Sequence, residues 1–298
     1  MRAAEKSKKR LLPVQWEELT ASDFPRAVER AAGVCVLPIG VIEFHGLHLP
    51  LGTDMIAARE ASISAARREY AVVFPPYYFG QVSEAKHRPG TVAVRPGFLM
   101  PVLQSTCDEI ARNGFQKILI VNGHGGDTHW LHFFCQSQLA TRKDYVVYVA
   151  LEFYGPETEA RMRAMYKTDY GGHGDEAETS WMMAIRPDLV QLARAGDESG
   201  RARDRLKHLE KDVFTGIWWY ARFPNHYAGD ARPANVALGE VALDGWSDNL
   251  ARVIREVKQD TATARLQKEF YRRVEDGKAR PGRNERRRGK RSGKEPMA

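Results

Sequence analysis

Continuous apolar runs alternate with amphipathic stretches through the first half of the chain. Four short runs, bounded by turn or charged residues, have the pattern of buried strands: residues 34–39, 71–74, 117–121 and 145–151. Three segments between them have helical periodicity: residues 55–69, 100–113 and 128–141. Strands that alternate with helices predict right-handed crossovers and a mainly parallel sheet, covered by helices on both faces. The expected fold class is α/β.

The second half of the chain is less regular. A helix is expected over residues 176–195, with a stop near Arg186-Pro187. Residues 197–215 are highly charged and are interpreted as an exposed helix or excursion. A long amphipathic helix is expected from about Asn235 to Arg273.

Charge is concentrated at the two ends of the chain. Residues 278–298 carry nine basic and two acidic side chains, whereas residues 11–277 carry 31 basic and 35 acidic ones. A mildly acidic body argues against specific binding to nucleic acid, which needs basic groups spread over a folded face. Because the C-terminal stretch has almost no large apolar residues, it cannot offset the entropy of ordering. We therefore expect three parts: a basic disordered head (1–12), a single domain (13–275) and a basic disordered tail (276–298).

Other features of the composition bear on location. No run approaches the roughly 18 apolar residues of a membrane helix, and no secretory signal follows the charged segment Met1 to Arg10. The expectation is a cytoplasmic protein with no membrane partner.

Cys35, Cys107 and Cys135 are odd in number and unpatterned in spacing, which predicts buried free thiols.

Metal-ligand residue types are densest just after the first predicted strand. Open α/β sheets place their sites at the carboxyl ends of strands, where Glu43 and His45 stand. In an extended segment, residues two apart point the same way and can meet one ion. Asp54 opens the next helix and, taken alone, is better explained as an N-cap than as a ligand. His48, followed by Leu-Pro-Leu, is interpreted as structural.

A second group, Asn122 to Asp127, follows the third predicted strand. Its three glycines let the backbone come close to a ligand and aim the imidazole of His124 inward. A phosphate-binding turn is the alternative. The segment has neither the Gly-x-Gly-x-x-Gly spacing nor a Gly-Lys-Ser/Thr ending, so a metal site is favoured.

A third group, His173 to Ser180, is a glycine turn that leads into a helix. Glu176 and Glu178 are two residues apart, so on a helix they cannot both face one point. One of them could serve a site while the other favours the helix N-terminus through its dipole. By itself the group is better explained as a capped helix with an acidic first turn. Together, the three groups form a nitrogen and oxygen ligand set suited to Zn²⁺, Mn²⁺ or Fe²⁺.

These segments closely resemble the three signatures of the creatininase family of metal-dependent amidohydrolases. The matching segments are Glu43 to Asp54, Asn122 to Asp127 and His173 to Ser180. The resemblance covers roughly residues 30–255. It implies a three-layer α/β/α fold, a centre of one or two divalent ions, and a homo-oligomer such as a hexamer.

The resemblance also assigns residues. It implies that the metal ligands are Glu43, His45, Asp54 and His124, with Asp54 bridging where two ions bind. Creatininase itself has a further Glu ligand two residues after the His of the second signature, and here that position is Gly126. Creatinine as the substrate is therefore left open. Glu176 becomes the expected replacement ligand or, failing that, a proton carrier.

The mechanism that follows is hydrolysis by metal-activated water. The ion would lower the pKa of its water to roughly 7 and polarise the scissile carbonyl. Glu176 or His173 would carry the proton to the leaving group. The expected substrate is a small polar molecule with a cyclic amide, formamide or related ring bond. Two alternatives stay open: the opening of a cyclic keto-inositol-type ring, and a non-catalytic metal-binding relative tethered through its basic tail.

The segment from Trp218 to Tyr227 is rich in aromatic residues. Such side chains offer large rigid surfaces and could form the wall of a pocket for a small ring. A packed subunit interface explains the same composition equally well.

Overall fold

The chain folds around a parallel sheet. The computed structural model describes residues 11–150, 152–169, 171–209 and 212–278. In order across the sheet, the described strands are β2 (Val72–Val73), β1 (Val34–Ile39), β3 (Lys117–Asn122) and β4 (Val146–Ala150). All neighbours pair in parallel, which confirms the predicted α/β class.

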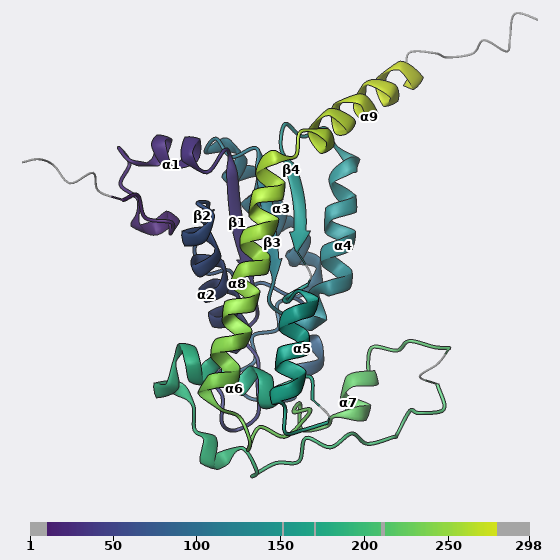
Figure 1. Ribbon diagram of the computed structural model, residues 1–298. Helices are drawn as coiled ribbons and strands as arrows, with labels where there is room; N and C mark the ends of the chain where they lie inside the picture. Colours follow the sequence, from purple (N-terminus) through teal and green to yellow (C-terminus); the bar gives the residue numbers. More distant parts are fainter. Residues whose placement is uncertain (1–10, 151, 170, 210–211, 279–298) are drawn as a thin grey trace, which may run out of the picture.

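Helices cover both faces of this sheet (Figure 1). They are α1 (Phe24–Arg30), α2 (Thr53–Arg68), α3 (Pro96–Arg112), α4 (Thr128–Ser137), α5 (Pro156–Met165), α6 (Glu176–Ile185), α7 (Trp218–Arg222), α8 (Val236–Gln259) and α9 (Ala262–Lys278). Short 3₁₀ turns connect several of them.

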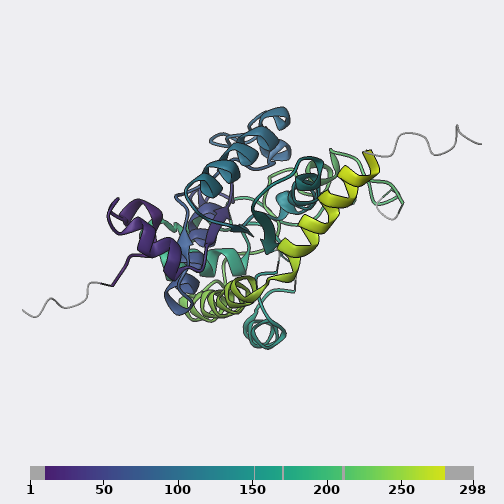
Figure 2. The same cartoon turned by 90° about the horizontal axis from the view of Figure 1, so that it is seen from above.

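Alternating strand side chains build two separate cores. Val34 and Val36 of β1 pack into a core shared with α2, α5, α6 and α8. Cys35 and Leu37 point to the opposite face, into a core shared with α1, α3 and α4. Figure 2 shows α8 and α3 on opposite sides of the strands. The expected three-layer α/β/α sandwich is therefore confirmed.

Strand β1 contains a proline although it has neighbours on both sides. The backbone hydrogen bonds of Val36 and Gly40 run to the β2 side, so the nitrogen of Pro38 faces that side too. Strand β2 ends at Val73, before it reaches this level. The missing N–H therefore costs no ladder hydrogen bond, and β1 continues to the edge where the candidate site lies.

The C-terminal half differs from the sequence-based expectation. The single helix expected over residues 235–273 is two helices, because α8 ends at Gln259 and the side chain of Asp260 accepts hydrogen bonds from the N–H groups of Ala262 and Thr263. By contrast, α6 ends at Ile185, which confirms the stop expected near Arg186-Pro187. Within its described residues, the stretch 197–215 is irregular, which agrees with the expected excursion and not with the exposed helix.

The predicted ends of the domain fall largely outside the described residues. The disordered head was expected over residues 1–12 and the tail over 276–298, of which only residues 11–12 and 276–278 are described. Residues 276–278 belong to α9, so the ordered chain extends past the expected boundary.

The cysteine and membrane expectations are tested by the described residues. All three cysteines are free; Cys35 and Cys107 are buried, and Cys135 is half-buried rather than buried. None of the described helices is both long and apolar enough to cross a membrane.

Candidate metal centre

The loops after β1 and β3 meet at one edge of the sheet. Ile39 at the end of β1 lies opposite Asn122 at the end of β3, so the two strands end at the same level. Glu43 and His45 follow the first strand, and His124 follows the second. All three side chains are buried. The structure therefore brings the first and second sequence signatures together.

Asp54 joins this group from the start of α2. The cap position of that helix is occupied by Gly52, and the carboxylate of Asp54 points into the cluster instead of capping the helix. Gly40 makes this close approach possible, since a Cβ there would lie 2.4 Å from the backbone nitrogen of Met55. The interpretation of Asp54 as an N-cap is wrong.

One group of ligand atoms surrounds what we call the first ion position. It consists of Glu43 Oε1, Asp54 Oδ2 and His124 Nδ1. The His124 nitrogen lies 3.0 Å from the Glu43 oxygen and 3.1 Å from the Asp54 oxygen. Nε2 of His124 lies 3.1 Å from the carbonyl oxygen of Gln81 and donates to it, which leaves Nδ1 facing the carboxylates.

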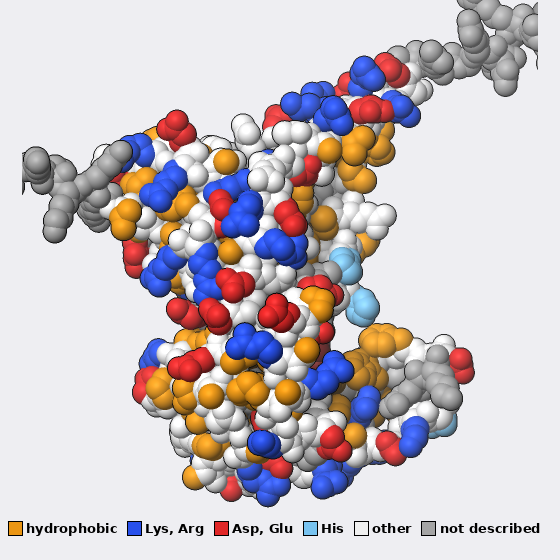
Figure 3. Space-filling view, viewed as in Figure 1, with side chains coloured by type: hydrophobic (Ala, Val, Ile, Leu, Met, Phe, Trp, Pro, Cys, Tyr) orange, Lys and Arg blue, Asp and Glu red, His pale blue; other side chains and the backbone are white. Residues whose placement is uncertain are grey.

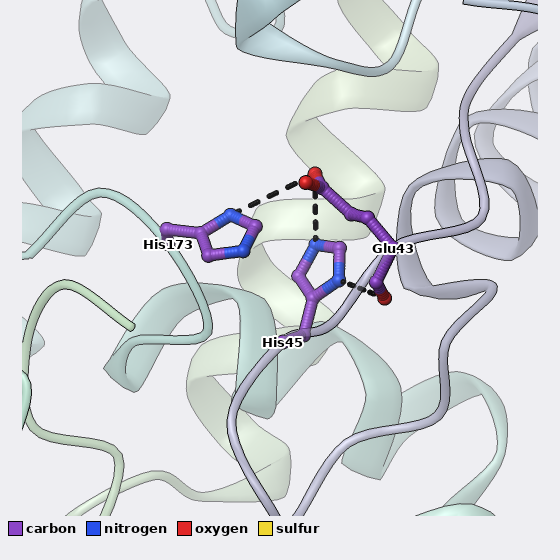
Figure 4. A group of neighbouring side chains, drawn as sticks. All are labelled: Glu43, His45 and His173. Carbon is purple, nitrogen blue, oxygen red and sulfur yellow. Dashed lines mark hydrogen bonds and ion pairs between the residues drawn. The ribbon is translucent and has the colours of Figure 1, made fainter. Parts of the chain in front are cut away.

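A second group surrounds the second ion position, which consists of His45 Nε2, Asp54 Oδ1 and Glu178 Oε2. The His45 nitrogen lies 2.9 Å from the Asp54 oxygen and 3.7 Å from the Glu178 oxygen. Nδ1 of His45 is 3.2 Å from the backbone oxygen of Glu43 and donates to it (Figure 4). Asp54 thus turns one carboxylate oxygen toward each position.

His173 approaches the cluster from the third signature. Its Nε2 donates to the backbone oxygen of Phe44 at 2.7 Å, so its Nδ1 keeps a free lone pair. That Nδ1 lies 3.9 Å from Oε1 of Glu43. Figure 4 shows the ring turned toward this carboxylate. Two backbone hydrogen bonds to Ala228 hold the residue in this place.

Glu176 and Glu178 have different roles, and the expectation for Glu176 needs correction. The carboxylate of Glu176 accepts hydrogen bonds from the backbone of Lys167 and from the backbone and hydroxyl of Thr168, at 2.8 to 3.0 Å. It fastens the loop after α5 and is absent from the ligand groups of the described residues. Glu178, on another side of α6, is the carboxylate that reaches His45.

His48 contributes to the architecture around the cluster. Its Nε2 lies 3.1 Å from the carbonyl oxygen of Gly174 and 2.9 Å from the hydroxyl of Thr179. These contacts connect the first signature to the third, which supports the structural interpretation of this histidine.

The pKa values of two carboxylates in the cluster, Glu43 and Glu178, are shifted in opposite directions. Burial alone would raise the pKa of Glu43, but the charge of His124 and the hydrogen bond from His226 hold it well below its ordinary value. Burial raises the pKa of Glu178 to about 8, although the charge on His45 opposes the shift. Glu43 is therefore ionised, whereas Glu178 holds its proton more readily.

The pKa values of His45 and His173 are also shifted in opposite directions. Burial would lower the pKa of His45, but the charge and hydrogen bond of Asp54 raise it to about 10. Burial and the neighbouring His45 lower the pKa of His173 to about 3. A proton on His45 neutralises carboxylate charge in the cluster, and a bound cation would take over that role.

The donor set fits a divalent metal ion. Oε1 of Glu43 is buried and accepts no hydrogen bond from any described residue, although it stands among ring nitrogens. An unsatisfied buried carboxylate oxygen is costly unless a cation or donor meets it. Carboxylate oxygens and imidazole nitrogens suit Zn²⁺, Mn²⁺ or Fe²⁺.

One residue of the site was not predicted from the sequence. His226 is 2% exposed, and its Nε2 lies 2.6 Å from Oε2 of Glu43. It stands in the aromatic segment that follows α7, outside the three signatures. The sequence gives one indication of this residue: it is a histidine within a segment that is otherwise rich in aromatic side chains.

A cavity of about 580 Å³ opens beside the cluster. It lies between the segment after β2, with Gln81 and His87, and the α7 region, with Phe214, Trp218 and Tyr220. Gln81 also holds His124, which connects the cavity to the first ion position. Figure 3 shows hydrophobic side chains on the α7 side of this hollow. Trp218 and Tyr220 thus line a pocket, as one of the two sequence interpretations expected.

A larger cavity of about 950 Å³ lies elsewhere, among α2, α6 and α8. Its lining residues include no ligand of either ion position. No ligand of either ion position lines the smaller cavity either, but its Gln81 contacts His124 and its wall is aromatic. We therefore take the smaller cavity as the candidate substrate pocket.

Comparison with known proteins gives a consistent result. The sequence model of the family Creatininase, described as creatinine amidohydrolase, matches residues 17–254. This range includes the whole sheet and all residues of the cluster.

Individual relatives agree with the family match. The chain is 30% identical over 256 residues to creatinine amidohydrolase of Pseudomonas putida, covering 80% of this chain and 95% of that protein. It is 23% identical over 258 residues to 3-dehydro-scyllo-inosose hydrolase of Thermotoga maritima, covering 78% and 79%. Its structure is similar to that of a creatininase with manganese, with a TM-score of 0.69 and 25% identity, over 83% of this chain and 99% of that one.

Proposed function

This chain belongs to the creatininase family, and we propose that it is a hydrolase dependent on one or two divalent metal ions. The proposed reaction is cleavage of a carbon–nitrogen bond, as in a cyclic amide or formamide, in a small polar molecule. The observation that carries this proposal is the buried Oε1 of Glu43, unsatisfied by any described donor and surrounded by imidazole nitrogens.

The ligands divide between the two ion positions. Glu43, Asp54 and His124 would hold an ion at the first position, and Asp54, His45 and Glu178 a second one. When bound, such an ion polarises a carbonyl group and lowers the pKa of water, so that nucleophile and electrophile are available at neutral pH. Glu178 occupies the role for which the sequence offered Glu176.

His173 is the residue proposed to move the proton. Its ring is neutral, because burial and His45 keep its pKa low, and its Nδ1 lone pair points toward the cluster. A pKa of about 3 is too low for a base at neutral pH, but a cation that displaces the proton of His45 would remove one of its causes. Nδ1 would then be placed to take a proton from the attacking water and give it to the leaving nitrogen. The hydrogen bond from Nε2 to Phe44 keeps the ring in this orientation throughout.

The pocket favours a small, flat substrate. Its volume of about 580 Å³ is in the range for small ligands, and Trp218 and Tyr220 supply flat apolar surface. Lys86 and Glu84 in its lining can bind polar groups of either charge. The similarity to the Thermotoga maritima hydrolase supports a second candidate reaction, the opening of a cyclic keto-inositol-type ring.

Metal analysis combined with a substrate screen tests the proposal. The purified full chain would be loaded with Zn²⁺, Mn²⁺ or Fe²⁺ and assayed on creatinine, other cyclic amides, formamides and ring ketones. We expect Glu43→Gln and His124→Ala to lose both bound metal and turnover.

Matched controls are available on the surface. Glu29→Gln and His132→Ala remove exposed side chains of the same types, and both should keep metal and activity. Retention of metal and of full turnover in Glu43→Gln or His124→Ala would refute the assignment.

A further inference from the structure

A chain of hydrogen bonds runs from α7 to Glu43 and has no part in the reaction proposed above. Nε1 of Trp219 donates to Nδ1 of His226 at 2.9 Å. Nε2 of His226 lies 2.6 Å from Oε2 of Glu43. The imidazole is almost completely buried, so its hydrogen bonds compete little with water.

The indole determines which nitrogen of His226 carries the proton. An indole N–H can donate but cannot accept, so Nδ1 of His226 must be the acceptor. The proton of the neutral ring is then on Nε2, which donates to Glu43. Trp219 therefore acts on Glu43 through the tautomer of His226.

This hydrogen bond leaves Glu43 with one free oxygen. Oε2 is occupied by His226, whereas Oε1 lies 3.0 Å from Nδ1 of His124 and 3.9 Å from Nδ1 of His173. The hydrogen bond to Oε2 keeps the carboxylate group from rotating, so Oε1 stays turned toward the first ion position.

The backbone of His226 is in a conformation that requires support. Its φ is 51°, in the left-handed region that residues other than glycine seldom adopt. Its N–H is bonded to the carbonyl oxygen of Phe223 at 3.0 Å. Conformations of this kind persist where the surrounding structure enforces them, and they cluster at functional sites. Here the strained turn directs an imidazole at Glu43.

We propose that Trp219 and His226 are positioning residues that fix Glu43 for binding the ion at the first position. The inference rests on the proposed function, because it takes Glu43 as an ion ligand. Losing an outer partner of a metal ligand typically weakens metal affinity about 10- to 100-fold. We expect His226 to have an effect of that size on Mn²⁺ affinity, and Trp219 a smaller one.

The test measures Mn²⁺ affinity of the full chain by competition with a chromophoric chelator. His226→Ala should weaken binding about 10- to 100-fold. His226→Gln keeps an N–H donor at the distance of Nε2 and should recover most of that loss. Trp219→Phe keeps an aromatic ring but loses the N–H, so its affinity should fall between those of the wild type and His226→Ala.

The neighbouring indole provides a matched control. Trp218 is more exposed, lines the cavity and is outside this chain of hydrogen bonds, so Trp218→Phe should leave Mn²⁺ affinity unchanged. Thermal unfolding of each variant shows whether a loss of affinity reflects a loss of folding.

Each contrary result has a distinct meaning. Wild-type affinity in both Trp219→Phe and His226→Ala would overturn the inference while leaving the proposed function intact. A wild-type chain that binds no Mn²⁺ would overturn both. Equal losses in His226→Gln, His226→Ala and Trp218→Phe would show a packing role and overturn the inference. If His226→Ala does not fold, unchanged affinity in Trp219→Phe is sufficient to overturn it.

Discussion

The two ion positions share Asp54 but are built in different ways. The first takes its other ligands, Glu43 and His124, from loops that directly follow two adjacent parallel strands. The second takes His45 from the loop after β1 and Glu178 from α6, and Nε2 of His45 lies 2.9 Å from Asp54 but 3.7 Å from Oε2 of Glu178. The corresponding separations at the first position are 3.0 and 3.1 Å.

The protonation states of the carboxylate ligands indicate which of the two positions is better suited to bind an ion. Glu43 is held ionised by its imidazole neighbours, whereas burial raises the pKa of Glu178 to about 8. A ligand that keeps its proton near neutral pH must release it before it can bind an ion. Despite burial, Glu43 and Asp54 raise the pKa of His124 well above its ordinary value, so each position must release an imidazole proton, and the second must also release the proton of Glu178. We therefore expect the first position to bind more tightly and the second to depend more steeply on pH.

Asp54→Asn should have the largest effect, because Asp54 is the one ligand that both positions use. The substitution keeps the shape of the side chain but removes the charge that compensates two cations. We expect loss of both ions and a fall in turnover that exceeds the roughly 10- to 100-fold cost of losing an outer partner. Metal content after gel filtration and steady-state assays measure both. A variant that still binds one ion tightly would contradict the shared role.

Glu178→Gln and Glu176→Gln separate the second position from the first. Glu178→Gln should lower the bound metal from two ions toward one, because of the two glutamates on α6 it is Glu178 that reaches His45. Glu176→Gln should leave metal content unchanged and lower the melting temperature by a few degrees, since it weakens the anchor of residues 167–168. Mass spectrometry measures the metal content of both variants, and thermal unfolding measures their melting temperatures. The reverse pattern would restore Glu176 as the ligand.

Affinity at the second position should rise with pH. Asp54 raises the pKa of His45 to about 10, so in the cation-free protein this imidazole is protonated at neutral pH. An ion needs the neutral Nε2 and must displace that proton, so binding weakens as pH falls. Each displaced proton should change the apparent affinity about tenfold per pH unit. Mn²⁺ titrations between pH 6.5 and 8.5 test this expectation, and a flat profile would contradict it.

Gly126→Ala should have the smallest effect, at the first position. A Cβ at residue 126 would lie 2.4 Å from Nε2 of His124 and push against its bond to Gln81. We expect a loss of Mn²⁺ affinity of about 1 kcal/mol, the low end for local overpacking. Gly125→Ala is the control, because nothing lies within 4 Å of a Cβ there. Equal affinities in the two variants would show that residue 126 does not constrain His124.

The sequence predicted those parts of the site that depend on local spacing. Glu43 and His45 are two residues apart in an extended segment, and His124 follows a recognisable strand. The choice between Glu176 and Glu178 depends on the rotation of α6 about its axis, which tertiary packing determines. Because Glu176 and Glu178 are two residues apart on a helix, the sequence excluded that both face the ions, but it did not show which one does.

Contacts between distant parts of the chain could not be predicted. His226 meets Glu43 across 183 residues through a left-handed turn, and no residue type in the segment requires that conformation. The break between α8 and α9 was missed for a different reason. The amphipathic pattern continues through it, and a capping contact from Asp260 overrides the periodicity.

Anomalous diffraction from crystals of the full chain soaked in Mn²⁺ tests the central claim most directly. We expect a strong peak among Glu43 Oε1, Asp54 Oδ2 and His124 Nδ1, and a weaker one among His45, Asp54 and Glu178. The absence of a peak among these residues, or a peak bound elsewhere with this cluster empty, would contradict it.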